Sequence, residues 1–154
     1  MPGERLSPAQ ILELLPQQRP FRFVDEILEV DERQISGRYT FRPDEFFYAG
    51  HFPGRPITPG VILLESMCQV GVVALGIYLF VLEHSAEAAA ERTTLFVEAE
   101  SEFMRPVLPG ETVTINGERL FWRRYKLRSR IEMFGADGVL VAQTTASGMG
   151  VKHG

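Results

Sequence analysis

Two titratable side chains in this sequence have surroundings that suit acid/base chemistry. His51 lies between Gly50 and Phe52-Pro53-Gly54, residues that fix the backbone and let other groups approach closely. Glu65 lies in the apolar stretch VILLESMCQV, where an unpaired carboxylate is costly and the pKa of the carboxyl rises. Such a carboxyl can donate a proton, and an imidazole can accept one at neutral pH.

Each of these residues also has a purely structural explanation. His51 could be a loop histidine that caps a turn, and Glu65 could be a structural carboxyl satisfied by a neighbouring hydrogen bond. A third feature favours chemistry, because Gly60 opens a long helix and leaves a backbone N–H unpaired at its positive end. That N–H suits an oxyanion, so the three groups together predict removal of a proton α to a thioester or ketone.

Other reaction classes lose support from the sequence. Cys68, the single cysteine, lies among apolar neighbours and is expected to pack, and neither His84 nor His153 has a companion at metal-ligand spacing. The sequence contains no glycine-rich phosphate loop, dinucleotide fingerprint or G-x-S-x-G motif. We therefore expect neither a metal nor a cofactor. The cysteine content and an N-terminus without signal-peptide features predict a cytoplasmic protein.

Hydrophobic periodicity and turn residues predict the elements that must position these groups. Ser7-Pro8-Ala9-Gln10 predicts the start of a short helix, and residues 61–82 predict a long helix buried on nearly all sides. Between the first two strands and the long helix, residues 42–60 are rich in proline and glycine and predict a structured loop. Glu65 makes membrane insertion of the long helix unfavourable. We expect six strands, at residues 23–30, 34–41, 93–103, 111–124, 125–134 and 139–149.

The length of 154 residues fits one domain. We expect it to span residues 1–154, with flexible ends at 1–7 and 150–154. A run of strands around one helix predicts an α+β fold in which a curved, antiparallel six-stranded sheet wraps that helix. One sheet of this size covers the apolar helix only partly, so a second copy of the chain is expected to cover the rest in a two-fold homodimer.

The segment GHFPGRPITPGV, from Gly50 to Val61, and the segment ESMCQ that begins at Glu65 carry a resemblance to a known family. They resemble the signature of the bacterial 3-hydroxyacyl-acyl-carrier-protein dehydratases of the hotdog-fold superfamily. The resemblance spans nearly the whole chain, because it also covers Leu14-Leu15-Pro16, Pro20-Phe21, Val24-Asp25, Phe103-Met104-Arg105-Pro106-Val107 and Pro109-Gly110.

The resemblance implies a fold, an assembly and a role for each of the three groups. It implies a hotdog fold whose working unit is a dimer, often with three dimers in a hexamer. His51 would take the α-proton, Glu65 would protonate the departing 3-hydroxyl, and the Gly60 N–H would polarise the thioester carbonyl. The histidine and the carboxylate of one site would come from opposite subunits. No cofactor is implied, because phosphopantetheine arrives with the substrate on the carrier protein.

This chain departs from the family pattern beside those groups. Gln17-Gln18-Arg19 stands where a histidine, an arginine and an aromatic residue are common, and Ser66-Met67-Cys68 stands where Ala-Met-Ala is common. Thr58 replaces a usual methionine. These changes bear on the chain-length preference and the housekeeping role more than on the reaction.

Two further groups of residues are candidates for binding the substrate and its carrier. The acyl channel is expected from aromatic side chains that could equally be plain core, namely Phe46, Phe47, Tyr48, Phe52 and Phe103. Six basic residues and no acid lie between Arg119 and Arg130 on a chain of net charge -4. This is either a solvated strand face or a surface for an acidic acyl carrier protein, which we favour over RNA because no RNA-binding module is recognisable. The expected docking residues are Arg105, Arg119, Arg123, Arg124, Lys126, Arg128 and Arg130.

The sequence therefore favours a lyase that converts 3-hydroxyacyl thioesters on a carrier protein to trans-2-enoyl thioesters, in fatty acid or related lipid or polyketide biosynthesis. Two alternatives remain open. A hotdog thioesterase would use the same helix and a carboxylate to activate water, although the His-Phe-Pro-Gly string counts against it. A non-catalytic acyl-binding or carrier-binding protein would bind the carrier tightly without turnover.

Overall fold

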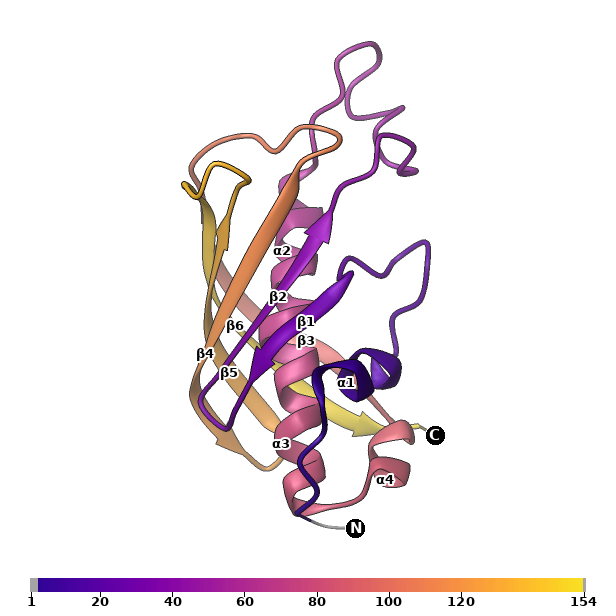
Figure 1. The fold of residues 1–154 in the computed structure, drawn as a ribbon, viewed down its shortest axis with the longest axis vertical. Coiled ribbons are helices and arrows are strands. Elements are labelled where there is room, and N and C mark those ends of the chain that lie inside the picture. Colours follow the sequence, from indigo (N-terminus) through magenta and orange to yellow (C-terminus); the bar gives the residue numbers. More distant parts are fainter. Residues whose placement is uncertain (1–2, 154) are drawn as a thin grey trace.

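The computed structural model describes residues 3–153, in which a curved sheet wraps around a central helix (Figure 1). Six strands pair antiparallel in the order β1-β2-β4-β5-β6-β3. Their bounds are Glu26–Val30 (β1), Gln34–Thr40 (β2), Arg92–Phe103 (β3), Thr112–Arg123 (β4), Lys126–Phe134 (β5) and Leu140–Lys152 (β6). This arrangement confirms the predicted α+β hotdog fold, while the dimer stays a prediction.

The central helix runs from Gly60 to Glu83 as α2 (Gly60–Cys68), a π-helical segment η1 (Gln69–Ala74) and α3 (Leu75–Glu83). Its middle is buried and passes very close to the sheet. A Cβ on Gly71 would lie 2.5 Å from Ile131 Cδ1, and a Cβ on Gly117 would lie 2.9 Å from Gly71 Cα. Only glycine permits this approach, because any side chain would overlap its neighbours.

By length and composition the same helix could cross a membrane, but that is weak evidence for a membrane span. Within the structure, 67% of its most apolar window is buried. A core helix that is wrapped by its own sheet passes the same length and composition test, and this helix is one (Figure 1).

Two short helices accompany the long one, and a serine caps the start of each. In α1 (Pro8–Leu14), the Gln10 N–H donates to Ser7 Oγ at 3.2 Å and the Ser7 N–H donates to Gln10 Oε1 at 2.8 Å. This capping box confirms the predicted helix start. In α4 (Ala86–Ala90), the Ala88 N–H donates to the Ser85 hydroxyl.

The chain ends differ from the expected flexible segments at residues 1–7 and 150–154. Leu6 is buried, and the Arg5 guanidinium donates to Glu32 Oε1 at 2.6 Å and to the Tyr78 hydroxyl at 3.2 Å. Residues 150–152 belong to β6 and pair with residues 92–94 of β3. The core extends to Leu6, and the long β3 supplies backbone partners for the end of β6. Residues 1, 2 and 154 lie outside the described residues.

β3 forms one edge of the sheet and exposes apolar side chains along its length. Leu95, Phe96, Val97 and Phe103 are 55%, 52%, 47% and 48% exposed. In the part of the chain that the structure describes, β3 has a strand neighbour on one side only, which is β6. A long apolar edge of this kind is a site where another chain can pair.

Candidate active site

The loop before α2 extends beyond the end of the sheet (Figure 1). Contacts within this loop hold His51 in a fixed orientation. The His51 ring is half-buried and stacks on Phe52, with ring centroids 4.1 Å apart. Its Nδ1 lies 2.8 Å from the carbonyl oxygen of Ile57. Because a carbonyl oxygen only accepts hydrogen bonds, Nδ1 carries the proton of the neutral ring, and Nε2 keeps a free lone pair.

Two buried hydroxyls tie this loop to the start of α2. The hydroxyl oxygens of Tyr48 and Thr58 lie 2.6 Å apart, and burial raises the pKa of the Tyr48 phenol. The Thr58 N–H also donates to the Val107 carbonyl at 2.9 Å. Thr58, at the position where the family usually has methionine, thus supplies the hydroxyl that closes the loop.

Gly60 begins α2, and its N-cap residue, Pro59, provides no side-chain cap. The Gly60 N–H therefore lies in the first turn of the helix, where no intrahelical acceptor exists. Phe103 covers this position, since a Cβ on Gly60 would lie 3.5 Å from the Phe103 ring. Two residues singled out from the sequence, Gly60 and Phe103, are neighbours in the fold.

Glu65 lies one turn and a half further along α2, on the wall of a cavity between the helix and the sheet. Burial raises the pKa of its carboxyl, and a hydrogen bond from Gln69 opposes part of that rise. Gln69 Nε2 donates to Glu65 Oε2 at 3.0 Å and to the Phe21 carbonyl at 2.8 Å. Gln69 Oε1 accepts from the Phe23 N–H at 2.7 Å, so the amide that orients Glu65 is itself fixed.

Two residues that line the cavity beside Glu65 each have a buried polar atom that lacks a partner. Gln17 Oε1 and Ser147 Oγ have no hydrogen bond among the described residues. An unsatisfied buried polar group costs about 1–3 kcal/mol, so such atoms mark places for water or a ligand. Burial also raises the pKa of the Cys68 thiol to about 12, which keeps that thiol protonated. The other lining residues are Val72, Val73, Thr94, Phe96 and Gly148.

His51 does not line the Glu65 cavity of its own chain. His51 belongs to the loop and Glu65 to the helix, and the helix rises about 7.5 Å between Gly60 and Glu65. This separation is compatible with a site that combines the histidine of one protomer with the carboxylate of another. That combination stays a prediction for the single chain described.

The aromatic residues expected to line the acyl channel lie elsewhere in this chain. Phe46, Tyr48 and Phe52 border a hollow on the outside of the loop, where Phe46 is 57% exposed. Phe47 packs against Phe23, with ring centroids 6.0 Å apart. None of the five predicted channel residues, which also include Phe103, lines the Glu65 cavity of the same chain.

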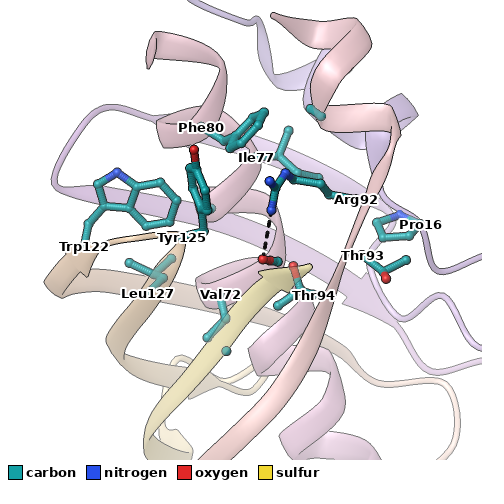
Figure 2. A pocket seen from close by; sticks show the side chains of 14 residues that line it. Pro16, Val72, Ile77, Phe80, Arg92, Thr93, Thr94, Trp122, Tyr125 and Leu127 are labelled. Carbon is teal, nitrogen blue, oxygen red and sulfur yellow. Dashed lines mark hydrogen bonds between the residues drawn. The ribbon is translucent and has the colours of Figure 1, made fainter. Parts of the chain in front are cut away.

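A second pocket, more apolar than the first, lies beside this cavity and is lined by residues of the later part of the helix, such as Ile77 and Phe80 (Figure 2). Val72, Thr94 and Gly148 line both hollows, which therefore share a wall. Arg92 brings a charge into the second pocket. The apolar and aromatic lining includes Ile77, Phe80, Trp122, Tyr125 and Leu127.

Sequence reasoning missed most of the residues around these two hollows. Gln17 could have been noticed in the sequence, because it replaces a histidine that is common in the family. Ser147 and Arg92 have no such signal in the sequence. The fold brings them to the helix from β6 and β3, and their spacing along the chain does not predict this contact. Between residues 3 and 153 no cluster of three or more His, Cys, Asp or Glu side chains could hold a metal ion.

Arg105, expected at the docking surface, belongs to an ion-pair network instead. Its Nη2 lies 2.7 Å from Glu111 Oε2 and 2.9 Å from Asp137 Oδ1. These contacts raise the pKa of Arg105 and lower the pKa of Glu111, while the Val139 N–H and then Arg105 lower the pKa of Asp137. Two carboxylates already pair with this guanidinium, and a role for Arg105 in docking stays a prediction.

The other basic residues lie on β4, β5 and the turn between them. This turn consists of Arg124 and Tyr125, whose φ angles of 53° and 64° fit a two-residue hairpin turn. Arg128 pairs with Glu98 at 3.6 Å and Arg130 with Glu118 at 2.8 Å. Four residues form no ion pair with any residue from 3 to 153, namely Arg119, Arg123, Arg124 and Lys126.

Solved structures with the same fold include enzymes of two classes. A dehydratase heterocomplex, ApeI:P from Xenorhabdus doucetiae, matches with a TM-score of 0.74 over 96% of this chain and 93% of that chain, at 14% identity. A thioesterase from Haemophilus influenzae matches with a TM-score of 0.68 over 97% of this chain and 94% of that chain, also at 14% identity. At this identity the likeness shows the fold alone.

Comparison of sequences identifies the family more specifically than the likeness in fold. The 3-hydroxyacyl-[acyl-carrier-protein] dehydratase FabZ of Thermus thermophilus is 39% identical over 75% of this chain and 77% of its own length. The FabZ of Paramagnetospirillum magneticum is 32% identical over 96% of this chain and 88% of its own length. A family model described as "FabA-like domain" matches residues 15–145. The chain therefore belongs to the FabA-like family and shares it with the FabZ dehydratases.

Proposed function

We propose that this protein removes water from 3-hydroxyacyl thioesters on acyl carrier protein and forms trans-2-enoyl thioesters, a hydro-lyase reaction of fatty acid biosynthesis. The observation that carries the proposal is Glu65, a carboxyl with a raised pKa on the wall of a cavity whose lining includes two residues with an unpartnered buried polar atom. Relatives that are 39%, 40% and 32% identical over most of this chain are named for the same reaction.

In this proposal the two titratable groups act on neighbouring carbons of the substrate. His51 Nε2 takes the proton from C2, and the electron pair of that C–H bond becomes the C2–C3 double bond. The C3–O bond breaks as Glu65 gives its proton to the departing hydroxyl, so one water leaves. The Gly60 N–H stabilises the negative charge that develops on the thioester oxygen. The His51–Ile57 hydrogen bond supports this role, because in the neutral ring it assigns the proton to Nδ1 and the lone pair to Nε2.

Gln17 and Ser147 are proposed to hold the leaving group. Gln17 Oε1 can only accept a hydrogen bond, so it suits the O–H of the 3-hydroxyl. The Ser147 hydroxyl can donate or accept and suits the released water. Both atoms are buried beside Glu65 without a protein partner, which supports a place for a polar ligand atom there.

The acyl chain is proposed to enter the second pocket rather than the aromatic loop of the same chain. This pocket shares a wall with the Glu65 cavity and is lined by Ile77, Phe80 and Leu127 among others. Apolar lining of this kind favours an alkyl chain. Residues of the loop, such as Phe52, would reach the site only from the opposite subunit, together with His51.

A homodimer is proposed as the working unit. The exposed apolar edge of β3, with Leu95 and Val97, supports it, because pairing two such edges would cover these side chains. The absence of His51 from the Glu65 cavity of its own chain supports it as well. A hexamer of three dimers is a further expectation from the family resemblance.

The proposed partner is an acyl carrier protein, as the names of the relatives indicate for those proteins. Its docking surface on this chain would be the four basic residues without ion pairs, Arg119, Arg123, Arg124 and Lys126, with Arg128 and Arg130 beside them. A positive region on a protein of net charge -4 suits an acidic partner. We further propose that the chain acts as one domain in the cytoplasm and without a metal or a bound cofactor.

The direct test is hydration of crotonyl-pantetheine, the reverse reaction, followed by loss of the enoyl absorbance. We expect His51→Ala and Glu65→Gln each to lower the rate by about 10²–10⁴-fold. His153→Ala and Glu87→Gln are matched controls at exposed positions and should keep the wild-type rate. Release of free thiol without hydration would indicate a thioesterase, and equal rates in all five proteins would reject an acid/base role for His51 and Glu65.

A further inference from the structure

The second pocket holds a charge that the dehydration reaction does not need. Arg92 reaches into it from the first residue of β3 (Figure 2). Its Cζ lies 4.4 Å from the centroid of the Tyr125 ring and 5.3 Å from that of Phe80. Stacking on two aromatic faces holds the planar guanidinium in one orientation. The aromatic platform is itself anchored, because the Tyr125 hydroxyl lies 3.2 Å from His84 Nε2.

Arg92 has no anionic partner among residues 3–153. It forms no ion pair there, and the nearby carboxylates have other contacts. Glu91 pairs with Lys152 at 4.0 Å, and Glu83 accepts from the Trp122 indole N–H at 3.3 Å. A positive charge in a largely apolar pocket is costly without a counter-charge, so this pocket is complementary to an anion.

Most of the hydrogen-bonding capacity of Arg92 is also unused. One N–H, on Nη1, donates to the Gly150 carbonyl at 3.1 Å. A guanidinium has five N–H donors in a planar fork that matches a carboxylate. The structure gives the Arg92 side chain no second hydrogen bond within the described residues, so several of its donors are available to a ligand in the pocket.

The position of Arg92 relates this charge to the acyl chain. Thr94, which lines both hollows, lies two residues from Arg92 on the same strand, or about 6.6 Å along β3. A chain whose thioester lies beside Glu65 and whose tail passes Thr94 would thus bring its far end toward the guanidinium. An alkyl terminus there would meet a charge, whereas a carboxylate terminus would find its counter-charge.

We propose that the second pocket binds the far end of the acyl chain and that Arg92 selects chains that end in a carboxylate. This inference rests on the proposed function, since it assumes that the acyl thioester binds beside Glu65. It adds a substrate class, dicarboxylic acyl groups attached to the carrier through one end.

A binding measurement tests the proposal without any turnover. Trp122 lines the pocket and is the single tryptophan of the chain, so its fluorescence reports occupancy directly. The probes are saturated pantetheine thioesters in matched pairs from octanoyl to dodecanoyl, one with a methyl terminus and one with a carboxylate terminus. We expect the carboxylate member to bind about tenfold more tightly at the best-fitting length, the size of one good charge-assisted contact.

Variants of Arg92 separate the effect of its charge from the effect of its packing against the aromatic rings. Arg92→Met keeps an unbranched side chain between the aromatic rings and should reduce the tenfold preference to about one, whereas Arg92→Lys should keep part of it. Arg33→Met, at an exposed position, should leave the preference unchanged. Equal binding of both members by the wild type, or a preference that persists in Arg92→Met, would overturn the proposal. Wild-type hydration of crotonyl-pantetheine is scored separately, so failure of the dehydratase assignment is distinguishable from failure of this inference.

Discussion

At the scale of single residues, the surroundings of Glu65 decide what its carboxyl can do. Burial favours the neutral form and raises the pKa, while the Gln69 amide fixes the orientation of the group. A general acid must still hold its proton when the substrate arrives. The apolar helix around Glu65 therefore serves the reaction as directly as the carboxyl itself.

The raised pKa of Glu65 predicts a pH-dependent cost in stability. A carboxyl whose folded-state pKa exceeds its unfolded-state pKa stabilises the fold below the unfolded value, and that contribution is lost as pH rises through the folded value. Glu65→Gln does not titrate. We expect the free energy of unfolding of this variant, relative to wild type, to increase from acidic to neutral pH in urea titrations. A difference that is constant across that range would contradict the burial argument.

Ser147 allows a test that separates function from stability. Its hydroxyl is buried without a partner, so Ser147→Ala should leave the free energy of unfolding unchanged or raise it by up to about 1 kcal/mol. The same variant should lose about tenfold in kcat/KM if the hydroxyl holds the leaving water.

Ser129 provides the matched control for that variant. Its buried hydroxyl donates to the Gly71 carbonyl at 2.7 Å, so Ser129→Ala removes a hydrogen bond that is made. That variant should unfold about 1 kcal/mol more easily. Equal losses of stability in Ser147→Ala and Ser129→Ala would show that the Ser147 hydroxyl already has a hydrogen-bond partner within the protein and is not available to a ligand.

At the scale of elements, the sequence predicted the helices and strands well because their signals are local. The capping residues at Ser7 and Gln10 marked the start of α1, and the two-residue turn at Arg124-Tyr125 fell at a predicted strand junction. The π-helical segment η1 left no such signal, because its hydrogen bonds shift within an unbroken apolar run.

The site was predictable only in part, because only some of its residues carry a local signal in the sequence. His51, Gly60 and Glu65 carry short-range signatures in the sequence. The hollows beside Glu65 combine residues from the segment after α1 to β6, and their composition depends on the curvature of the sheet. The aromatic loop does not line the Glu65 cavity of its own chain, because its rings pack on one another and on Phe23, so its place in an acyl channel stays a prediction for the dimer.

Close packing between helix and sheet predicts an asymmetry between two glycines of the central helix. Gly71→Ala would put a methyl group 2.5 Å from Ile131, so the helix would have to move, at a cost of about 1–3 kcal/mol. Gly76→Ala would place its methyl 3.8 Å from Leu127 and should be neutral or stabilising, since alanine favours helix. Thermal unfolding of both variants checks this, and equal melting temperatures would contradict the packing argument.

At the scale of the whole molecule, the exposed edge of β3 is the proposed dimer interface. Val97 lies on this edge and is 47% exposed. If two edges meet, Val97→Lys buries a charge in the interface and should shift the sedimentation profile from dimer toward monomer. Val139→Lys, at a turn residue that is 54% exposed, should keep the wild-type profile. A dimer that resists Val97→Lys would place the interface elsewhere.

A site shared between two subunits, as proposed, would make activity a property of the dimer. A protomer that lacks His51 can still provide Glu65, and a protomer that lacks Glu65 can still provide His51. A mixed dimer of the two variants would therefore contain one complete site and one site that lacks both groups.

Subunit mixing is the most direct test of a site shared between two protomers. His51→Ala and Glu65→Gln proteins with different tags are unfolded together, refolded and purified through both tags, and crotonyl-pantetheine hydration is measured on the mixed dimers. Purified mixed dimers should recover about half of the wild-type rate, because one of two sites is intact. Mixed dimers as inactive as either parent would contradict a site built by His51 of one protomer and Glu65 of the other.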